Sequence, residues 1–475
     1  MNFSLRLLVR SGFRFASAAI AIVGFTFALG QSMHAQMQSS EAKSTGSASV
    51  EEFSYEAGIE ALEAFQLEVN DQLRARHFDE LDRLASKLRA GKVRWPGSRW
   101  KLSDFYVGLE EPRPGLNPTD EDWKSHLRLL QEWKNAKPQS ISARVALAAA
   151  YVGYGYHARG VGFSDTVSDN GWELFRERVT KADQVLQEAA NLREKCPHWY
   201  AVLLEVAKAD GWPKDKTTAL FEKAVAYEPL YYEYYHDLAD YLQPKWHGEP
   251  GETENFAKQS ADRLGGDEGD VLYFQLAFSQ RCSCKKEPIM KSMSWERIKK
   301  GYEASERVYG KSLMRTNHIA YMASKVGDVI TADDAFKRMA GRWSEPVWGN
   351  EGVFENWRDW VTRMAPQERE EQKFKLELSR NMETPEGKRH GIEIEQVLSK
   401  HYGECSSTAS ESAKVPFRIM IELKADGTPI AMRAEPWTDV WQCLVKFLPM
   451  KAGTLSAPPR DKYWFSDVDP RAISN

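Results

Sequence analysis

The sequence predicts a mainly α-helical protein: a tetratricopeptide-like solenoid of helical hairpins, followed by a small α+β domain at the C-terminus. Two observations lead to this fold class. Between residues 53 and 362, apolar residues recur at intervals of three and four, which is the spacing of one helix face. After residue 392 apolar and polar residues alternate instead, which is typical of strands.

Residues 1–30 have the layout of a secretory signal peptide. Arginines precede an uncharged apolar run, and small residues stand before a cut at Gln31. Alternatively the run stays as a membrane anchor, because about 20 uncharged residues just span a bilayer. Either way we expect the protein to be exported, to the periplasm, to the outer face of the inner membrane, or into the medium. Residues 31–52 are small and polar and predict a flexible linker.

Residues 53–362 predict a series of helix pairs. The first apolar run extends from Tyr55 to Leu88, and an alanine-rich helix capped at Ser140 or Ser142 ends at Gly160. Turns at Gly211 to Pro213 and at Glu228-Pro229 separate three further runs, and Gly327 marks the turn of a later pair. Because one pair cannot bury its own apolar face, neighbouring pairs must stack.

Residues 363–391 are heavily charged and predict one exposed helix followed by a linker. Residues 392–475 predict the small α+β domain. Its hairpin starts at Phe417 and turns at Asp426-Gly427. A helix capped by Thr438 and a closing strand around Tyr463 complete a β-β-α-β order.

Five cysteines are present, so one must stay unpaired if the others form disulfides in an oxidising compartment. Cys405 and Cys443 lie in the same C-terminal segment, and we expect this pair to form a disulfide. Cys282 and Cys284 stand too close in sequence for an unstrained bridge. The state of Cys196, Cys282 and Cys284 stays open.

The stretches "FDELDRLASKLRAGKVRWPGSRWKLSDFYVGL", "CPHWYAVLL" and "WHGEPGE" resemble a bacterial family of tetratricopeptide-like helical proteins described only as a domain of unknown function. The resemblance covers about residues 52–348 and implies a helical fold, with no reaction and no site residues. Residues 416–469 are similar to the C-terminal domain of TonB-like energy transducers in their β-β-α-β order and their "ADG" and "PP" motifs. The Pro-rich linker of those proteins is absent. A domain of this topology exposes a strand edge that can capture an extended peptide.

The net charge of −4 and the absence of a basic stripe argue against nucleic-acid binding. The chain contains no H-E-x-x-H and no G-x-S-x-G motif, and "SERVYGKS" lacks the first glycine of a phosphate loop, so no cofactor is predicted. We therefore expect an exported helical-repeat scaffold in the cell envelope that binds a protein or peptide partner. The alternative is an envelope glycan hydrolase or lyase, because Trp, Tyr and acid pairs are abundant.

Two neighbouring features are candidate binding sites. A tyrosine-rich helix carries more aromatic residues than one buried face needs. Either both of its faces are buried between neighbouring helices, or one face lines a groove that binds a ligand; the candidates are Tyr231, Tyr232, Tyr235 and His236. The corner after it holds Trp246, His247 and Glu249. Metal binding by His247 and Glu249 is the weaker hypothesis, and no metal is predicted.

Overall fold

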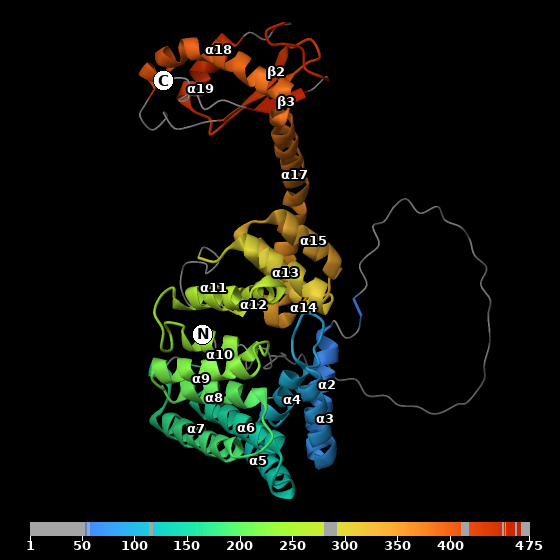
Figure 1. Ribbon diagram of the computed structural model, residues 1–475, viewed down its shortest axis with the longest axis vertical. Helices are drawn as coiled ribbons and strands as arrows, with labels where there is room; N and C mark the ends of the chain where they lie inside the picture. The colour runs from blue at the N-terminus through green and yellow to red at the C-terminus, as the bar shows by residue number, and fades with distance from the viewer. Residues whose placement is uncertain are drawn as a thin grey trace, which may run out of the picture. The chain divides into compact units, whose positions relative to one another are not determined.

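The computed structural model describes residues 53–54, 58–113, 117–160, 162, 164–279, 292–409, 418–448, 451, 453–460 and 463–466. The predicted signal segment, the linker, Cys282 and Cys284 lie outside these ranges. The chain divides into two compact units, Met1–Val361 and Thr362–Asn475. The predicted mainly α fold is confirmed, with one small antiparallel sheet near the C-terminus (Figure 1). Among the described residues, no helix combines the length and the hydropathy that a membrane span requires.

The first unit is built from helices. They are α2 (Ile59–Arg74), α3 (Phe78–Gly91), α4 (Lys101–Glu110), α5 (Asp120–Ala136), α6 (Ile141–Arg159), the 3-10 helix η2 (Ser164–Thr166), α7 (Asp169–Ala190), α8 (Pro197–Ala209), α9 (Lys214–Tyr227), α10 (Glu233–Tyr241), α11 (Glu252–Leu264), α12 (Gly266–Ser279), α13 (Trp295–Tyr309), α14 (Leu313–Val326), α15 (Val329–Met339) and α16 (Glu345–Trp348). The predicted cap Ser140 accepts a hydrogen bond from the Ala143 N–H at the start of α6.

Consecutive helices of the first unit pack as pairs, notably α6 with α7, α8 with α9, α12 with α13 and α14 with α15. Burial differs between the two members of a pair. In α6 and α12 nearly every residue is buried, whereas α7 and α13 bury a single stripe. A helix that is apolar on all sides needs neighbours on all sides. The first helices of the pairs therefore form the interior of the unit.

Helix α4 is one of the neighbours that cover these interior helices. Its residues Leu102 to Leu109 are all buried, and the helix contacts α2, α3, α6 and α8. The contact with α2 is so close that a Cβ atom at Gly108 would stand 2.5 Å from the carbonyl oxygen of Gln66. Asn70 Nδ2 then donates to the Gly108 carbonyl oxygen at 2.9 Å. The N-terminal helices thus cover the first helices of the later pairs.

The loop before α4 joins parts of the first unit that are far apart in sequence. Gly97, with a φ of 78°, donates its N–H to the Gly310 carbonyl oxygen at 3.2 Å. Its own carbonyl oxygen accepts from Arg315 Nε at 3.0 Å. Gln275 Nε2 donates to Ser98 Oγ at 2.6 Å. These contacts fasten the N-terminal helices to α12, α13 and α14.

The second unit begins inside α17 (Glu351–Glu383) and continues with α18 (Pro385–Thr408), β1 (Arg418–Leu423), β2 (Pro429–Glu435), α19 (Asp439–Leu444), the 3-10 helix η6 (Val445–Phe447) and β3 (Tyr463–Ser466). The linker predicted within residues 363–391 is wrong, because α17 is followed almost at once by α18. Thr384 caps α18 by accepting from the Gly387 N–H, and Pro385 occupies the first turn, where proline favours a helix start.

The sheet has the order β2-β1-β3, with both pairs antiparallel. The predicted hairpin is confirmed: Arg418 pairs with Glu435, and the turn uses Gly427 at a φ of 77°. Thr438 caps α19 by accepting from the Trp441 N–H, also as predicted. One face of the sheet packs on α18 and α19 through a buried cluster that includes Leu398 and Trp441.

A disulfide joins Cys405 of α18 to Cys443 of α19, which is the pair that the sequence favoured. Phe374 of α17 packs edge-on against Trp464 of β3, with ring centroids 4.8 Å apart. Arg433 of β2 stands over the Phe374 ring at 4.9 Å. The sheet therefore has helix contacts on both of its faces.

Candidate functional site

The tyrosine-rich helix is packed on both faces. Tyr231, Tyr232 and Tyr235 are all buried, which agrees with the alternative in which both faces pack and not with a groove along these residues. The Tyr231 hydroxyl lies 2.7 Å from His198 Nδ1, and the Tyr235 hydroxyl donates to the Pro229 carbonyl oxygen at 3.0 Å. Burial raises the pKa of Tyr235 to about 12, which keeps its hydroxyl a neutral donor. The tyrosines therefore belong to the core.

One tyrosine of this run, Tyr232, belongs to an aromatic cluster around a cation that the chain itself supplies. The Arg94 guanidinium stands over the rings of Trp100, Tyr309 and Tyr232 at 4.8, 4.9 and 5.5 Å. Both tyrosine hydroxyls donate to the Glu268 carboxylate. An arginine enclosed by aromatic rings is attracted to their faces, and this cluster ties the Arg94 loop to α10, α12 and α13.

His236 lies at the border of the same core. It is half-buried, and its Nε2 is 3.4 Å from Gln275 Oε1. Gln275 is the residue whose amide also holds Ser98, so His236 belongs to the contacts that connect α10 with α12. This residue therefore has a packing role next to the buried tyrosines.

The corner after α10 is built around a backbone carbonyl group of α8. His247 Nε2 lies 2.9 Å from the Lys208 carbonyl oxygen, and the His247 ring packs on Tyr241 with centroids 4.6 Å apart. Trp246 is half-buried, with Lys208 Nζ 5.4 Å from its ring centroid. Glu249 is exposed, and its backbone N–H donates to Glu252 Oε2 at 2.9 Å. Each of the three predicted residues thus has a separate structural contact.

No group of three or more His, Cys, Asp or Glu side chains that could hold a metal ion occurs in the described part of the chain. The corner formed by Trp246 and His247 lies over a buried cluster of charged side chains. Lys208 Nζ lies 2.7 Å from Asp240 Oδ2 and 3.5 Å from Glu205 Oε2. Burial opposes the charge of Lys208, but Asp240 and Glu205 hold its pKa well above the usual range. The lysine charge is therefore compensated by two carboxylates beneath the corner.

The open edge of the C-terminal sheet is the other candidate site. Strand β2 is outermost, and among the described residues it pairs only with β1. The opposite edge differs, because Asn381 of α17 donates its side-chain amide to the Trp464 carbonyl oxygen of β3. Two large apolar side chains are exposed beside β2: Ile430 at 37 % and Trp437 at 57 %. The β2 edge thus combines backbone groups without a described partner and apolar contact area.

Comparisons of the chain with protein-family models, with curated proteins and with solved structures found no match. The functional argument therefore rests on the residues of the two units.

Proposed function

We propose that the protein is an exported helical-repeat scaffold of the bacterial cell envelope that binds an extended segment of a protein partner at the β2 edge. The observation that carries the proposal is an open edge strand with Ile430 and Trp437 exposed beside it. Ile430 is the second residue of β2 and Trp437 comes shortly after its last residue, so apolar contact area is offered near both ends of the edge.

The hydrogen-bonding groups of β2 support this mode of binding. In an antiparallel pair, every second residue directs its N–H and C=O away from the neighbouring strand. Natural proteins often block such an edge with charged side chains. Arg433 does not extend past the edge, because it lies over the Phe374 ring and 3.8 Å from Glu371 of α17. An added peptide strand would gain main-chain hydrogen bonds from β2 and side-chain contacts from Ile430 and Trp437.

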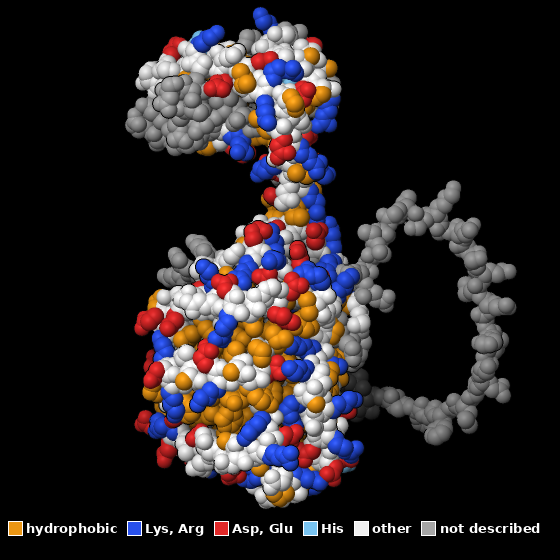
Figure 2. All heavy atoms as spheres, in the orientation of Figure 1, with side chains coloured by type: hydrophobic (Ala, Val, Ile, Leu, Met, Phe, Trp, Pro, Cys, Tyr) orange, Lys and Arg blue, Asp and Glu red, His pale blue; other side chains and the backbone are white. Residues whose placement is uncertain are grey.

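The first unit supports the scaffold part of the proposal. Contacts of α6 with α8, α8 with α10 and α10 with α12 support stacking of successive helix pairs, which is what a tetratricopeptide-like solenoid requires. Hydrophobic side chains are visible across the middle of this unit, over α8 to α12 (Figure 2). We place the peptide at the sheet edge because this edge offers backbone groups together with apolar side chains. The disulfide between Cys405 and Cys443 supports export, since such bonds persist in oxidising compartments.

Site-specific crosslinking in cells tests the proposal. A photoreactive benzoylphenylalanine replaces Ile430 or Trp437 in the full chain, and the control position is Leu376, which is 52 % exposed on α17. We expect one discrete adduct from positions 430 and 437, with mass spectrometry mapping the crosslink to one extended segment of the partner. Adducts equal to those from position 376 would speak against the site.

A binding measurement then uses a synthetic peptide of the mapped segment. Ile430→Lys places a charge beside the edge, and we expect it to raise the Kd about tenfold, equivalent to about 1.4 kcal/mol. Leu376→Lys is the matched control and should leave the Kd unchanged. Equal affinity of both variants would contradict binding at β2.

A further inference from the structure

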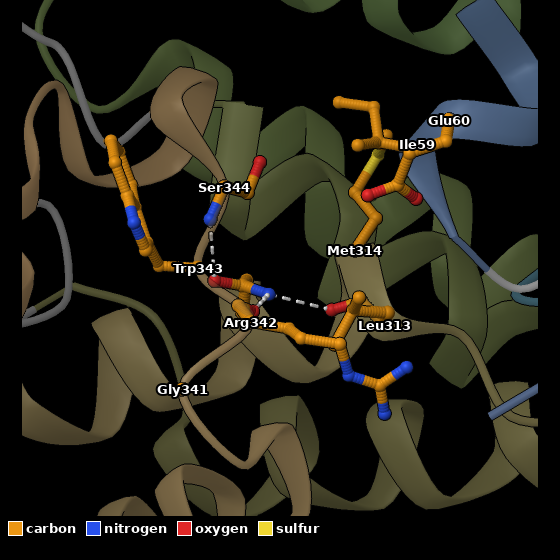
Figure 3. A pocket seen from close by; sticks show the side chains of 9 residues that line it. Ile59, Glu60, Leu313, Met314, Gly341, Arg342, Trp343 and Ser344 are labelled. Atoms are coloured by element: carbon orange, nitrogen blue, oxygen red, sulfur yellow. Dashed lines mark hydrogen bonds between the residues drawn. The ribbon is translucent and has the colours of Figure 1, made fainter. Parts of the chain in front are cut away.

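A pocket of about 250 Å³ lies in the first unit, between the start of α2, the start of α14 and the turn that leads into α16 (Figure 3). Its lining is divided about equally between apolar and polar side chains. The apolar ones are Ile59, Leu313, Met314 and Trp343, and the polar ones are Glu60, Asn317, Arg342 and Ser344. Ligand pockets usually measure roughly 300–1,000 Å³, so this one suits a single side chain or a very small molecule.

Asn317 fixes the wall on the side of the turn. Its buried side chain donates to the carbonyl oxygens of Leu313 and Arg342 at 2.9 and 3.3 Å. It also accepts from the Ser344 N–H at 3.1 Å and from Trp348 Nε1 at 2.8 Å. All the hydrogen-bonding capacity of this amide is thus used on the turn, so the pocket is preorganised.

The hydroxyl of Ser344 is the unusual group in the pocket. Ser344 is 5 % exposed, and its Oγ has no hydrogen-bond partner among the described residues. A serine at a helix N-cap normally accepts from the first turn, but Ser344 makes no such bond to α16. Figure 3 shows this hydroxyl directed across the pocket toward Glu60 and Met314. A buried hydroxyl without a partner costs roughly 1–3 kcal/mol, which a polar ligand group would recover.

One acidic and one basic side chain, those of Glu60 and Arg342, line the pocket, and they are oriented differently. Figure 3 shows the Glu60 carboxylate turned toward the cavity, whereas the Arg342 guanidinium extends away from it and stands 5.1 Å from the Phe53 ring. Glu63, one turn after Glu60, and Glu345, next to Ser344, add acidic groups nearby. Burial first, and then the charges of Glu60 and Glu345, raise the pKa of Glu63. A cation would relieve this repulsion.

We propose that this pocket binds an ammonium or guanidinium group carried on a short aliphatic chain. Glu60 pairs with the cation, the Ser344 hydroxyl accepts one of its N–H groups, and Ile59, Met314 and Trp343 pack against the aliphatic part. A charge-assisted hydrogen bond and an indole wall are both suited to such a cation. The same chemistry is offered by a lysine or arginine side chain of a partner and by a free small amine. The site lies in the first unit and does not depend on the β2 edge.

Calorimetric titration of the purified full chain tests the site with three probes: butylamine, agmatine, and a blocked pentapeptide with one central lysine. Butanol, which has the same chain length without the charge, is the neutral control. We expect at least one cationic probe to bind and butanol not to bind. Preference for the peptide assigns the site to a partner's side chain, and preference for the amines assigns it to a free ligand.

Variants locate the binding. Glu60→Gln should weaken it about tenfold, since about 1.4 kcal/mol corresponds to that factor, and Ser344→Ala should weaken it about threefold. Glu121→Gln, at an exposed position of α5, is the matched control and should bind like the native chain. Because Glu60 is exposed, its replacement leaves folding intact, which a melting curve verifies. Binding of butanol as strong as that of butylamine, no binding of any cation, or an unchanged affinity of the Glu60→Gln variant would overturn the proposal.

Discussion

Replacing Asn317 by alanine should destabilise the first unit more than any exposed substitution. The side chain is fully buried, and its Oδ1 accepts from the Ser344 N–H and from Trp348 Nε1. Alanine leaves both donors buried without an acceptor. Each such donor costs about 1–3 kcal/mol, so the free energy of unfolding should fall by about 2–6 kcal/mol.

The assay must separate the two units, because they need not unfold in one transition. Hydrogen exchange at increasing urea concentration, followed on peptides from α14 and from the turn before α16, reports the first unit alone. Asn350→Ala is the control. Asn350 accepts a single exposed hydrogen bond from the Val353 N–H, so we expect a loss of about 1 kcal/mol. A loss at Asn317 that does not exceed the loss at Asn350 would refute the role given to this amide.

Three further predictions concern buried groups of both units. Burial lowers the pKa of His126 from 6.5 to about 4. As the pH falls through this window, the unfolded chain takes up the proton first, so the free energy of unfolding drops by roughly 3 kcal/mol at most. His126→Gln should remove this part of the pH dependence, which urea titrations at pH 7 and pH 4 measure. Cys405→Ser should lower the stability of the second unit by about 3–4 kcal/mol, because the disulfide to Cys443 closes a loop of 38 residues. Calorimetry should show that the midpoint temperature of the first unit's transition does not change. Lys208→Met leaves Asp240 without its closest cation and should lower the free energy of unfolding by about 3–5 kcal/mol. Adding Asp240→Leu should restore part of that loss. Additive losses in a double-mutant cycle would disprove the coupling between Lys208 and Asp240.

Features that depend on neighbouring residues could be predicted from the sequence. The hairpin at Asp426-Gly427 and the caps Ser140 and Thr438 follow from local hydrogen bonding and backbone conformation. Glu252 also lies in the first turn of α11, as its position before an apolar stripe indicates.

Some local signals were misleading because tertiary contacts use the same residue types. Asp267 and Asp270 stand between Gly265-Gly266 and an apolar run that begins at Val271, a pattern typical of the cap of a new helix. Helix α12 instead starts at Gly266, and Asp270 is buried within it, 3.1 Å from Arg297 Nε. A buried acid paired with an arginine of the next helix and a cap residue cannot be distinguished from sequence alone.

The sites depend on contacts between residues far apart in the chain. The pocket joins Glu60 to Ser344, and the aromatic cluster joins Arg94 to Tyr309. Helical periodicity gives the buried face of each helix but not its partner, so it could not show which segments meet. The surplus of tyrosines was visible in the sequence, but the arginine that stands over the Tyr232 ring lies in the loop before α4, far away in the chain.

Hydrogen exchange of β2 in the full chain, with and without the peptide captured at position 430, tests peptide binding at this edge most directly. The account predicts that alternate amides of β2 slow by about tenfold or more when the peptide is added, because new main-chain hydrogen bonds protect them, while β1 changes little. Unchanged exchange in β2, with slowing confined to the helices of the first unit, would contradict it.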